Sequence, residues 1–383
     1  MYKLFCNKIV LIVYLLSIVL YTGQGFFFEG TWFTSLAGYF ILMVNLVFTA
    51  SYFLRRRSNK VLKWMMLFVV WTILVWLVSP KNINTHGMGT MSTLSMVQYT
   101  LIIMTTTFSI IAFKQGGVLK NAYMILFYIG ILSLLEMNFF FERTATLFDS
   151  KQTSNLGYPI VSLMPLTVFF WKKKTVFWFL VLFIFIMSLV SVKRGAILCS
   201  GVFILIIVFS YLREQRKIKF KTIVALCIVG GLVLYIGSQF LNNSEFLQQR
   251  LLDTLEGNTS SRDYIYKNII NSWSYSGIFH QVFGNGPIAT TKLGILAHND
   301  WLEVLYDFGL VGLMLYVLFI FGIYFFWVRK KNIPVQCKCA FFMVFAYYVL
   351  RSTFSMSFYV LDTVLVMFAF GYFIAEANSQ VKY

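Results

Sequence analysis

The sequence predicts an all-α polytopic membrane protein, and three observations support that fold class. Hydrophobic residues make up 59% of the 383 residues, charged residues make up only 12%, and apolar runs of helical length recur along the chain. A soluble domain carries about 25% charged residues, so this chain lacks the polar side chains needed to cover a water-facing surface. A cytosolic globular enzyme, a nucleic-acid-binding domain and a disordered tail are therefore excluded, and the lipid bilayer is the expected surrounding.

Twelve apolar segments are candidates for membrane-spanning helices, because about 20 apolar residues cross the hydrocarbon core. They cover residues 9–22, 31–54, 61–79, 92–113, 121–141, 154–171, 175–192, 195–212, 222–240, 301–327, 339–356 and 358–375. The sixth contains Gly157, Pro159 and Pro165, so we expect a broken or kinked helix there. The first follows Lys3 and Lys8 without a small-residue cleavage pattern, so we interpret it as a retained span.

The basic residues predict the orientation of these spans, since Lys and Arg are retained in cytoplasmic loops. With the N-terminus inside, the inner segments hold 22 Lys and Arg against 2 Asp and Glu, which gives +20. The outer segments hold the other 10 basic and 12 acidic residues, which gives −2 and accounts for the net charge of +18. Both termini are therefore expected in the cytoplasm.

The spacing of the spans divides the chain into three parts. Predicted helices 1–9 occupy residues 1–240, one large extracytoplasmic loop occupies 241–300, and helices 10–12 occupy 301–383. Within the loop we expect short helices: one over about 243–256, and an amphipathic aromatic stretch over 261–283 suited to the membrane surface. The Gly-Asn-Gly-Pro sequence at 284–287 predicts a turn that closes the loop.

Three ionisable residues stand where this loop enters the tenth predicted span. His298 precedes the helix, and Glu303 and Asp307 are four residues apart and so share one helix face. Ionisable groups at membrane depth are costly and suggest a functional site. The simpler interpretation is that Asn299 or Asp300 caps the helix and that the acids complement its dipole, which leaves His298 unexplained.

This part of the chain resembles a known family. The residues that carry the resemblance are Phe283-Gly284-Asn285-Gly286, His298-Asn299, Leu302 and Gly309-Leu310-Val311-Gly312. They are similar to the signature of the O-antigen ligase and O-antigen polymerase superfamily, which are bacterial integral membrane glycosyltransferases with about twelve spans. The resemblance implies a GT-C-like fold over the whole chain, although the specific motifs cover only about 190–312.

The resemblance also implies arginines that hold the diphosphate of a lipid-linked sugar donor. Arg194, in Ser191-Val192-Lys193-Arg194-Gly195, and Arg262, which precedes the aromatic stretch, match the family pattern. Guanidinium groups bind phosphate through paired hydrogen bonds, and a cation at a turn near the lipid boundary is stabilised by an anion. The alternatives are snorkelling for Arg194 and a surface ion pair with Asp263 or Glu256 for Arg262.

Other charged residues are weaker candidates for contacts with substrate. Arg351 and Asp362 flank the last external turn and are expected to pair, with a substrate contact by Arg351 secondary, and Arg143 in an outer loop is a further candidate. The basic residues Lys193, Arg250, Lys267 and Lys292 are interpreted as solvated surface. No P-loop, HExxH or Asp-x-Asp motif is present, so neither a cofactor nor a metal is expected.

These features predict a glycosyltransferase that polymerises undecaprenyl-diphosphate-linked repeat units of a capsule or O-antigen, with the active site on the outer face of the bacterial cytoplasmic membrane. His298 is the expected base, Glu303 or Asp307 would orient it or contact substrate, and a flippase and a chain-length regulator are the expected partners. The alternatives are an O-antigen ligase that acts on lipid A core, or a polysaccharide flippase or transporter. The abundance of Phe, Ile, Lys and Asn is typical of a low-GC genome without lipid A core and favours the polymerase.

Overall fold

The computed structural model describes residues 5–23, 31–55, 59–79, 92–145, 156–191, 193–215, 231, 262–293 and 296–380, except for the side chains of 141–145. Every regular element in these ranges is a helix, and they contain no strand. Apart from residue 231, the predicted span 222–240 lies outside the described residues, as do the predicted loop helix at 243–256 and the rest of 241–261.

The first five helices follow the predicted spans closely. They are α2 (Lys8–Thr22), α4 (Trp32–Leu54), α5 (Lys60–Val78), α6 (Thr93–Gln115) and α7 (Asn121–Ala145). Asn59 begins α5 by accepting hydrogen bonds from the Val61 and Leu62 amides at 3.1 and 3.4 Å. Polar residues at N-cap positions satisfy amides that the first helical turn leaves unpaired, which explains why the basic loop ends here.

The sixth predicted span is broken, as expected. It consists of α8 (Gly157–Ser162), α9 (Met164–Thr167) and a 3-10 turn, η1 (Val168–Phe170). Pro165 stands in the first turn of α9, where its missing N–H removes no intrahelical bond. The chain is nevertheless buried through most of this stretch, because neighbouring helices enclose the break.

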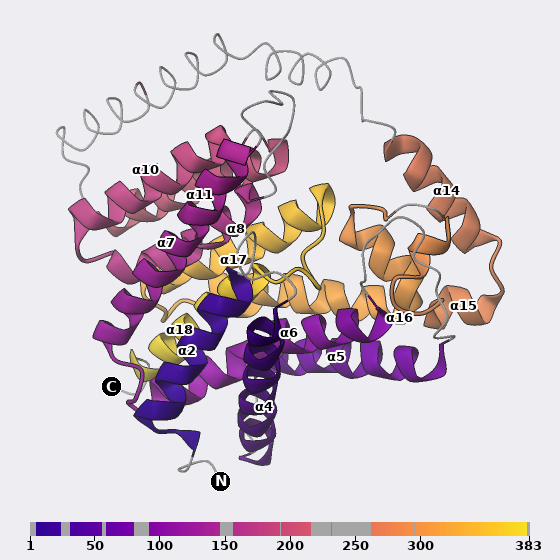
Figure 1. Ribbon diagram of the computed structural model, residues 1–383, viewed down its shortest axis with the longest axis horizontal. Coiled ribbons are helices and arrows are strands. Elements are labelled where there is room, and N and C mark those ends of the chain that lie inside the picture. Colours follow the sequence, from indigo (N-terminus) through magenta and orange to yellow (C-terminus); the bar gives the residue numbers. More distant parts are fainter. Residues whose placement is uncertain are drawn as a thin grey trace.

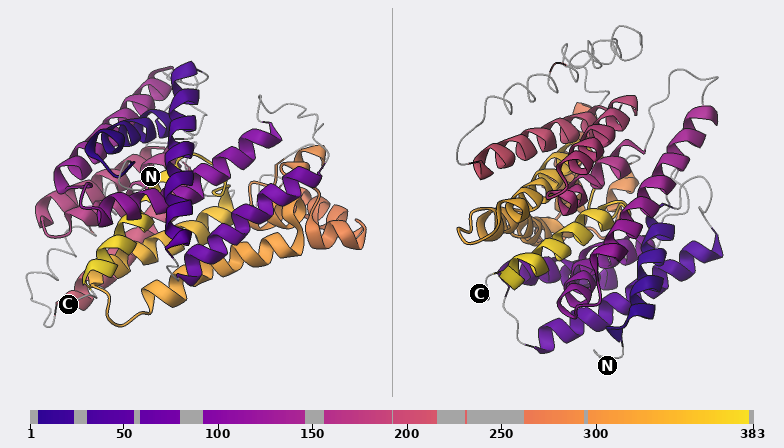
Figure 2. Two further views of the ribbon diagram at one scale, coloured as in Figure 1. Left: turned by 90° about the horizontal axis from the view of Figure 1, so that it is seen from below. Right: turned by 90° about the vertical axis from the view of Figure 1, so that its left-hand side faces the viewer.

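The remaining helices carry the C-terminal half of the molecule (Figure 1). They are α10 (Lys174–Val190), α11 (Arg194–Glu214), α14 (Arg262–Ser274), α15 (Ile278–Phe283), a 3-10 turn η2 (Ala289–Leu293), α16 (Asp300–Ile323) with a π-helical turn η3 (Tyr324–Val328), α17 (Val335–Phe354) and α18 (Thr363–Gln380). The short helices α14 and α15 lie beside the start of α16, and α5 runs along the length of α16 (Figures 1 and 2).

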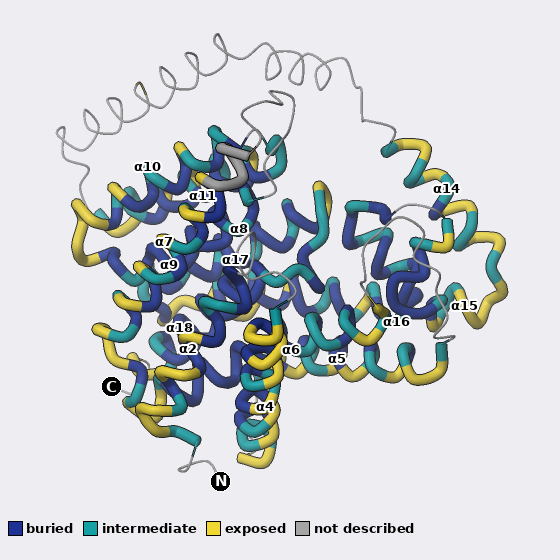
Figure 3. The backbone as a smooth tube through the Cα atoms, in the orientation of Figure 1, coloured by how far each residue is buried: buried dark blue, intermediate teal, exposed yellow. Residues whose placement is uncertain are grey.

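Helix α18 forms the centre of the bundle. Its side chains from Thr363 to Ala375 are all buried, and it packs against α6 and α17 (Figure 3). A helix that is apolar all round must be enclosed on every side. The helices that contact α18 therefore enclose it, with α6 and α17 making the largest contacts.

Helix α4 shows how the pattern of a soluble helix is reversed. Its outer face exposes Leu36, Tyr39, Met43 and Leu46, whereas its inner face buries Asn45 completely. The Asn45 amide accepts hydrogen bonds from Tyr14 of α2 at 2.6 Å and Ser109 of α6 at 2.5 Å, and it donates to α6 at 3.2 Å. Polar side chains that bond across helices stabilise packing where lipid supplies no hydrophobic drive.

Six helices within the described ranges are long and apolar enough to cross a membrane: Trp32–Leu54, Lys60–Val78, Thr93–Gln115, Asn121–Phe140, Arg194–Glu214 and Asp300–Val328. Shorter apolar helices cover Lys8–Thr22, Gly157–Phe170 and Lys174–Val190. The chain is thus an all-helical, multi-pass membrane protein. The count of twelve spans and the outer location of the 241–300 loop stay predictions.

Candidate functional site

His298 lies at a sharp turn immediately before α16. Its φ of 50° is in the left-handed region, which few non-glycine residues adopt although histidine is among those enriched there. The next residue, Asn299, caps the helix as predicted, because its side chain accepts a hydrogen bond from the Leu302 amide at 3.2 Å. Asn299 also donates to the Thr353 carbonyl at 3.2 Å, which ties this turn to the end of α17.

Glu303 holds the chain that leads into His298. The carboxylate is completely buried and accepts hydrogen bonds from the Ala297 amide and the Thr290 hydroxyl, each at 2.5 Å. One turn later, the buried Asp307 carboxylate accepts from the Ile288 amide at 2.7 Å and the Thr290 amide at 3.3 Å. The hydrogen bonds of these two acids hold the segment 288–298 in place. Their predicted roles, to orient the imidazole or to bind substrate, stay predictions.

A kink in α16, which the sequence did not predict, receives the Gly-Asn-Gly turn. Gly309 has φ 68° and ψ −172°, a conformation essentially restricted to glycine, and Gly284 has φ 92°. A Cβ atom at either glycine would collide with backbone, that of Val282 for Gly309 and that of Asp307 for Gly284. The two glycines therefore allow direct backbone contact, sealed by a bond from the Gly286 amide to the Asp307 carbonyl at 3.0 Å.

Two cationic residues, Lys193 and Arg262, lie close enough to His298 to act on its charge. Lys193 and Arg194 stand at the start of α11, and Arg262 begins α14 and donates to the Phe354 carbonyl at 3.2 Å. Burial lowers the pKa of the His298 imidazole below its ordinary value of 6.5, and the positive charges of Arg262 and Lys193 lower it further. The imidazole is therefore neutral at pH 7, next to charges that attract anions.

Tyr158 is a member of this cluster that sequence reasoning missed. The Lys193 ammonium lies 5.4 Å from the centre of its ring, and the Arg351 guanidinium lies 4.5 Å from it. A side chain at Gly195 would collide with the Tyr158 hydroxyl, so the glycine that follows Arg194 makes room for this tyrosine. The break between α8 and α9 was visible in the sequence, but its packing against α11 was not.

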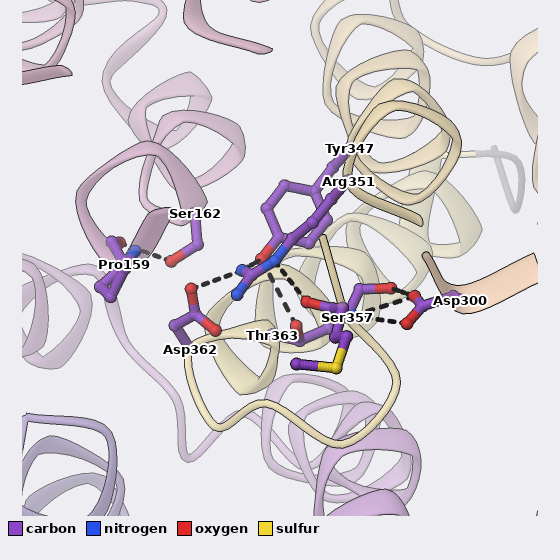
Figure 4. Close-up of polar contacts among 9 residues, drawn as sticks. Pro159, Ser162, Asp300, Tyr347, Arg351, Ser357, Asp362 and Thr363 are labelled. Atoms are coloured by element: carbon purple, nitrogen blue, oxygen red, sulfur yellow. Dashed lines mark hydrogen bonds and ion pairs between the residues drawn. The ribbon is translucent and has the colours of Figure 1, made fainter. Parts of the chain in front are cut away.

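Arg351 forms the predicted ion pair with Asp362 (Figure 4). The two side chains are buried and 2.5 Å apart, and Arg351 also donates to the Tyr347 hydroxyl and to the Met356 carbonyl, the latter at 2.7 Å. Its Nε and Nη1 nitrogens thus bond to protein partners, and the predicted substrate contact stays a prediction. The predicted candidate Arg143 belongs to α7, but its side chain lies outside the described residues.

Asp300 connects the start of α16 to the turn between α17 and α18 (Figure 4). This completely buried carboxylate accepts hydrogen bonds from Ser352 at 2.9 Å, from Tyr316 at 3.0 Å, and from both the amide, at 2.9 Å, and the hydroxyl of Ser357. A buried charge is tolerated only where hydrogen bonds replace its hydration. His298 therefore rests on a scaffold fixed from two directions, by Glu303 and by Asp300.

Comparison with protein families relates one segment of this chain to a known family. Residues 178–317 match the family model described as O-antigen ligase. The resemblance to the O-antigen ligase and polymerase superfamily is confirmed. The matched segment, residues 178–317, contains Arg194, Arg262, His298, Glu303 and Asp307, and excludes Arg143 and Arg351.

The match supports, at the level of the family, an O-antigen ligase- or polymerase-like membrane glycosyltransferase. No curated protein matches the chain. Within the described ranges, no three His, Cys, Asp or Glu side chains gather in a way that could hold a metal ion. The matched segment thus presents a neutral imidazole, a group of cations and a buried carboxylate scaffold.

Proposed function

We propose that the chain polymerises undecaprenyl-diphosphate-linked oligosaccharide repeat units on the outer face of the bacterial cytoplasmic membrane, for a capsule or O-antigen. The observation that carries this proposal is the position of the His298 imidazole beside the charges of Arg262 and Lys193. A transferase with a diphosphate leaving group needs a base for the incoming hydroxyl and cations for the departing anion. This cluster offers both.

In the proposed reaction, a hydroxyl oxygen of the acceptor sugar attacks the anomeric carbon of the donor. His298 accepts the hydroxyl proton as the new C–O bond forms. The bond between the anomeric carbon and the diphosphate oxygen breaks, and its electron pair leaves with the lipid diphosphate. Arg262, Lys193 and Arg194 stabilise the negative charge that grows on the leaving group, and the imidazolium returns its proton to water.

Binding of a diphosphate would also improve His298 as a base. The cations that lower its pKa in the free protein are the groups that the anion would neutralise. The imidazole would thus become more basic when the donor is in place. The polymerase is preferred over the ligase because the composition is typical of a low-GC genome without lipid A core.

The experiment uses the full-length protein in liposomes with a lipid-linked repeat unit. His298→Asn removes the base but keeps a residue type that tolerates the left-handed backbone. We expect wild-type protein to make a ladder of longer glycans and His298→Asn to make none, with unchanged folding. His280→Asn, at the other described histidine, is the matched control and should leave the ladder intact.

Three results would count against the proposal. A normal ladder from His298→Asn would remove the base from the mechanism. Movement of the lipid-linked unit across the bilayer without new glycosidic bonds would identify a flippase instead. Growth only when lipid A core is supplied as acceptor would identify a ligase.

A further inference from the structure

A cavity lies at the end of the helix bundle opposite His298. Its volume is about 390 Å³, and it is lined where α6 and α18 end and where α10 and α17 begin. His298, in contrast, lies near the end of α17. Because a helix rises 1.5 Å per residue, the 20 residues of α17 separate the two sites by about 30 Å, so this cavity is distinct from the site described above.

The charges that line the cavity favour an anion. The Lys114 ammonium is 3.1 Å from the Glu376 carboxylate and 3.1 Å from the Tyr372 hydroxyl. That pair is neutral as a unit. Lys172 and Lys173 also line the cavity and are exposed, so they supply an excess of two positive charges at its rim.

The backbone adds to this preference at the same rim. Lys173 is the N-cap residue of α10, and because an ammonium group has no acceptor, its side chain cannot cap the amides of the first turn. The start of a helix carries partial positive charge from its unpaired amides and attracts anions. The Lys173 ammonium and the N-terminus of α10 therefore both attract an anion to the same rim.

The rest of the wall is aromatic and apolar. Phe169, Phe170, Trp171 and Tyr372 line the cavity, and the Trp171 indole donates to the Glu214 carboxylate at 2.9 Å, which fixes the ring. Lysine with tryptophan and tyrosine is the composition of a membrane–water interface. A volume of this size lies within the range of about 300–1,000 Å³ found for small-molecule sites.

We propose that this cavity binds the phosphate group of an anionic phospholipid from the adjacent leaflet. The phosphate would lie between Lys172 and Lys173, and the glycerol and upper acyl carbons would contact Phe169 and Trp171. Basic pockets between helices on the cytoplasmic side are suited to such headgroups, and the charge distribution predicts that this end of the bundle is cytoplasmic. Free inorganic phosphate shares the chemistry and is the other source to be tested.

The test measures lipid binding by the full-length protein in phosphatidylcholine nanodiscs, with phosphatidylglycerol as the probe. The variant Lys172→Gln/Lys173→Gln removes the rim charges, and Lys330→Gln/Lys331→Gln is the matched control, an exposed adjacent pair that does not line the cavity. We expect the first variant to bind phosphatidylglycerol roughly tenfold more weakly or worse, since each lysine near a surface contributes to anionic-lipid affinity. The control should bind as the wild type does.

Three outcomes would overturn the proposal. The first is equal binding by all three proteins, and the second is equal weakening in both variants, which would indicate only a general surface effect. The third is binding of inorganic phosphate with no preference for phosphatidylglycerol over phosphatidylcholine, which would identify a free-phosphate site. Unchanged thermal melting of the variants in phosphatidylcholine shows that loss of binding is not loss of fold, and glycan transfer is not needed for any of these readings.

Discussion

Replacing Glu303 tests whether the buried carboxylates position the His298 turn. Glu303→Ala leaves the Ala297 amide and the Thr290 hydroxyl without their acceptor. Each hydrogen bond to a charged group contributes about 1.5–3 kcal/mol, so local opening of residues 288–298 should become easier by at least about 3 kcal/mol. Since about 1.4 kcal/mol is a factor of ten, amide hydrogen exchange in this segment should accelerate by at least roughly 100-fold.

The isosteric variant separates position from charge. In Glu303→Gln the amide oxygen still accepts from Ala297, and the amide nitrogen donates to the Thr290 hydroxyl, which can rotate to accept. We expect exchange of this segment close to the wild type in Glu303→Gln, and glycan transfer largely retained. Hydrogen–deuterium exchange followed by mass spectrometry of peptides covering 288–298 provides the measurement. Wild-type protection in Glu303→Ala would refute the positioning role.

Three further substitutions test other parts of the structure. Gly309→Ala should destabilise the protein by about 2 kcal/mol or more, because the backbone φ of Gly309 is positive and a Cβ atom there would collide with the Val282 backbone. The control Gly201→Ala, where a Cβ atom meets open space, should change stability by no more than about 1 kcal/mol. Equal melting temperatures for the two variants would contradict this prediction. Arg351→Ala should lower the free energy of unfolding by about 3–5 kcal/mol, because it leaves the buried Asp362 carboxylate without its cationic partner. The double variant Arg351→Met/Asp362→Asn should recover most of that stability in the same thermal-melting assay. The rate of glycan transfer should fall at acidic pH as His298 becomes protonated, at a pH below 6.5 in the free enzyme. Arg262→Gln should shift this acidic fall in rate to higher pH, because one of the charges that lower the pKa of His298 is gone. Lys267→Gln, on the exposed face of the same helix, is the control and should leave the pH profile unchanged.

The helices were predictable because the sequence carries their boundaries locally. Apolar runs are separated by short basic loops, and a capping residue such as Asn59 stands within two residues of the predicted start. The broken sixth helix was equally visible, since Pro159 and Pro165 cannot continue a helix interior. The Arg351–Asp362 pair followed from two opposite charges flanking one short turn.

The site was only partly predictable because its contacts join distant parts of the chain. Gly309 lies within an apolar run, so the sequence predicts a continuous span there. Its kink depends on contact with Gly284, 25 positions earlier, which the local sequence does not indicate. Lys193 was assigned to the surface, since nothing in its neighbourhood showed that Arg262 and His298 would lie near it. The acids at 303 and 307 were found by their helical spacing, but whether they faced an imidazole or a backbone could not be read from that spacing.

The bonds of Asp300 have a consequence for the order in which the protein is made. The donors Ser352 and Ser357 are 52 and 57 residues further along the chain, so a ribosome must synthesise α17 and the following turn before all of the donors to that carboxylate are in place. A nascent chain that ends before residue 352 would lack both serine donors and would leave Asp300 with the Tyr316 hydroxyl as its described side-chain donor, at the depth where α16 enters the membrane. The His298 turn is therefore among the last parts of the molecule to mature, and a chain shortened at its C-terminus should be recognised by quality-control proteases rather than accumulate as a partly active enzyme.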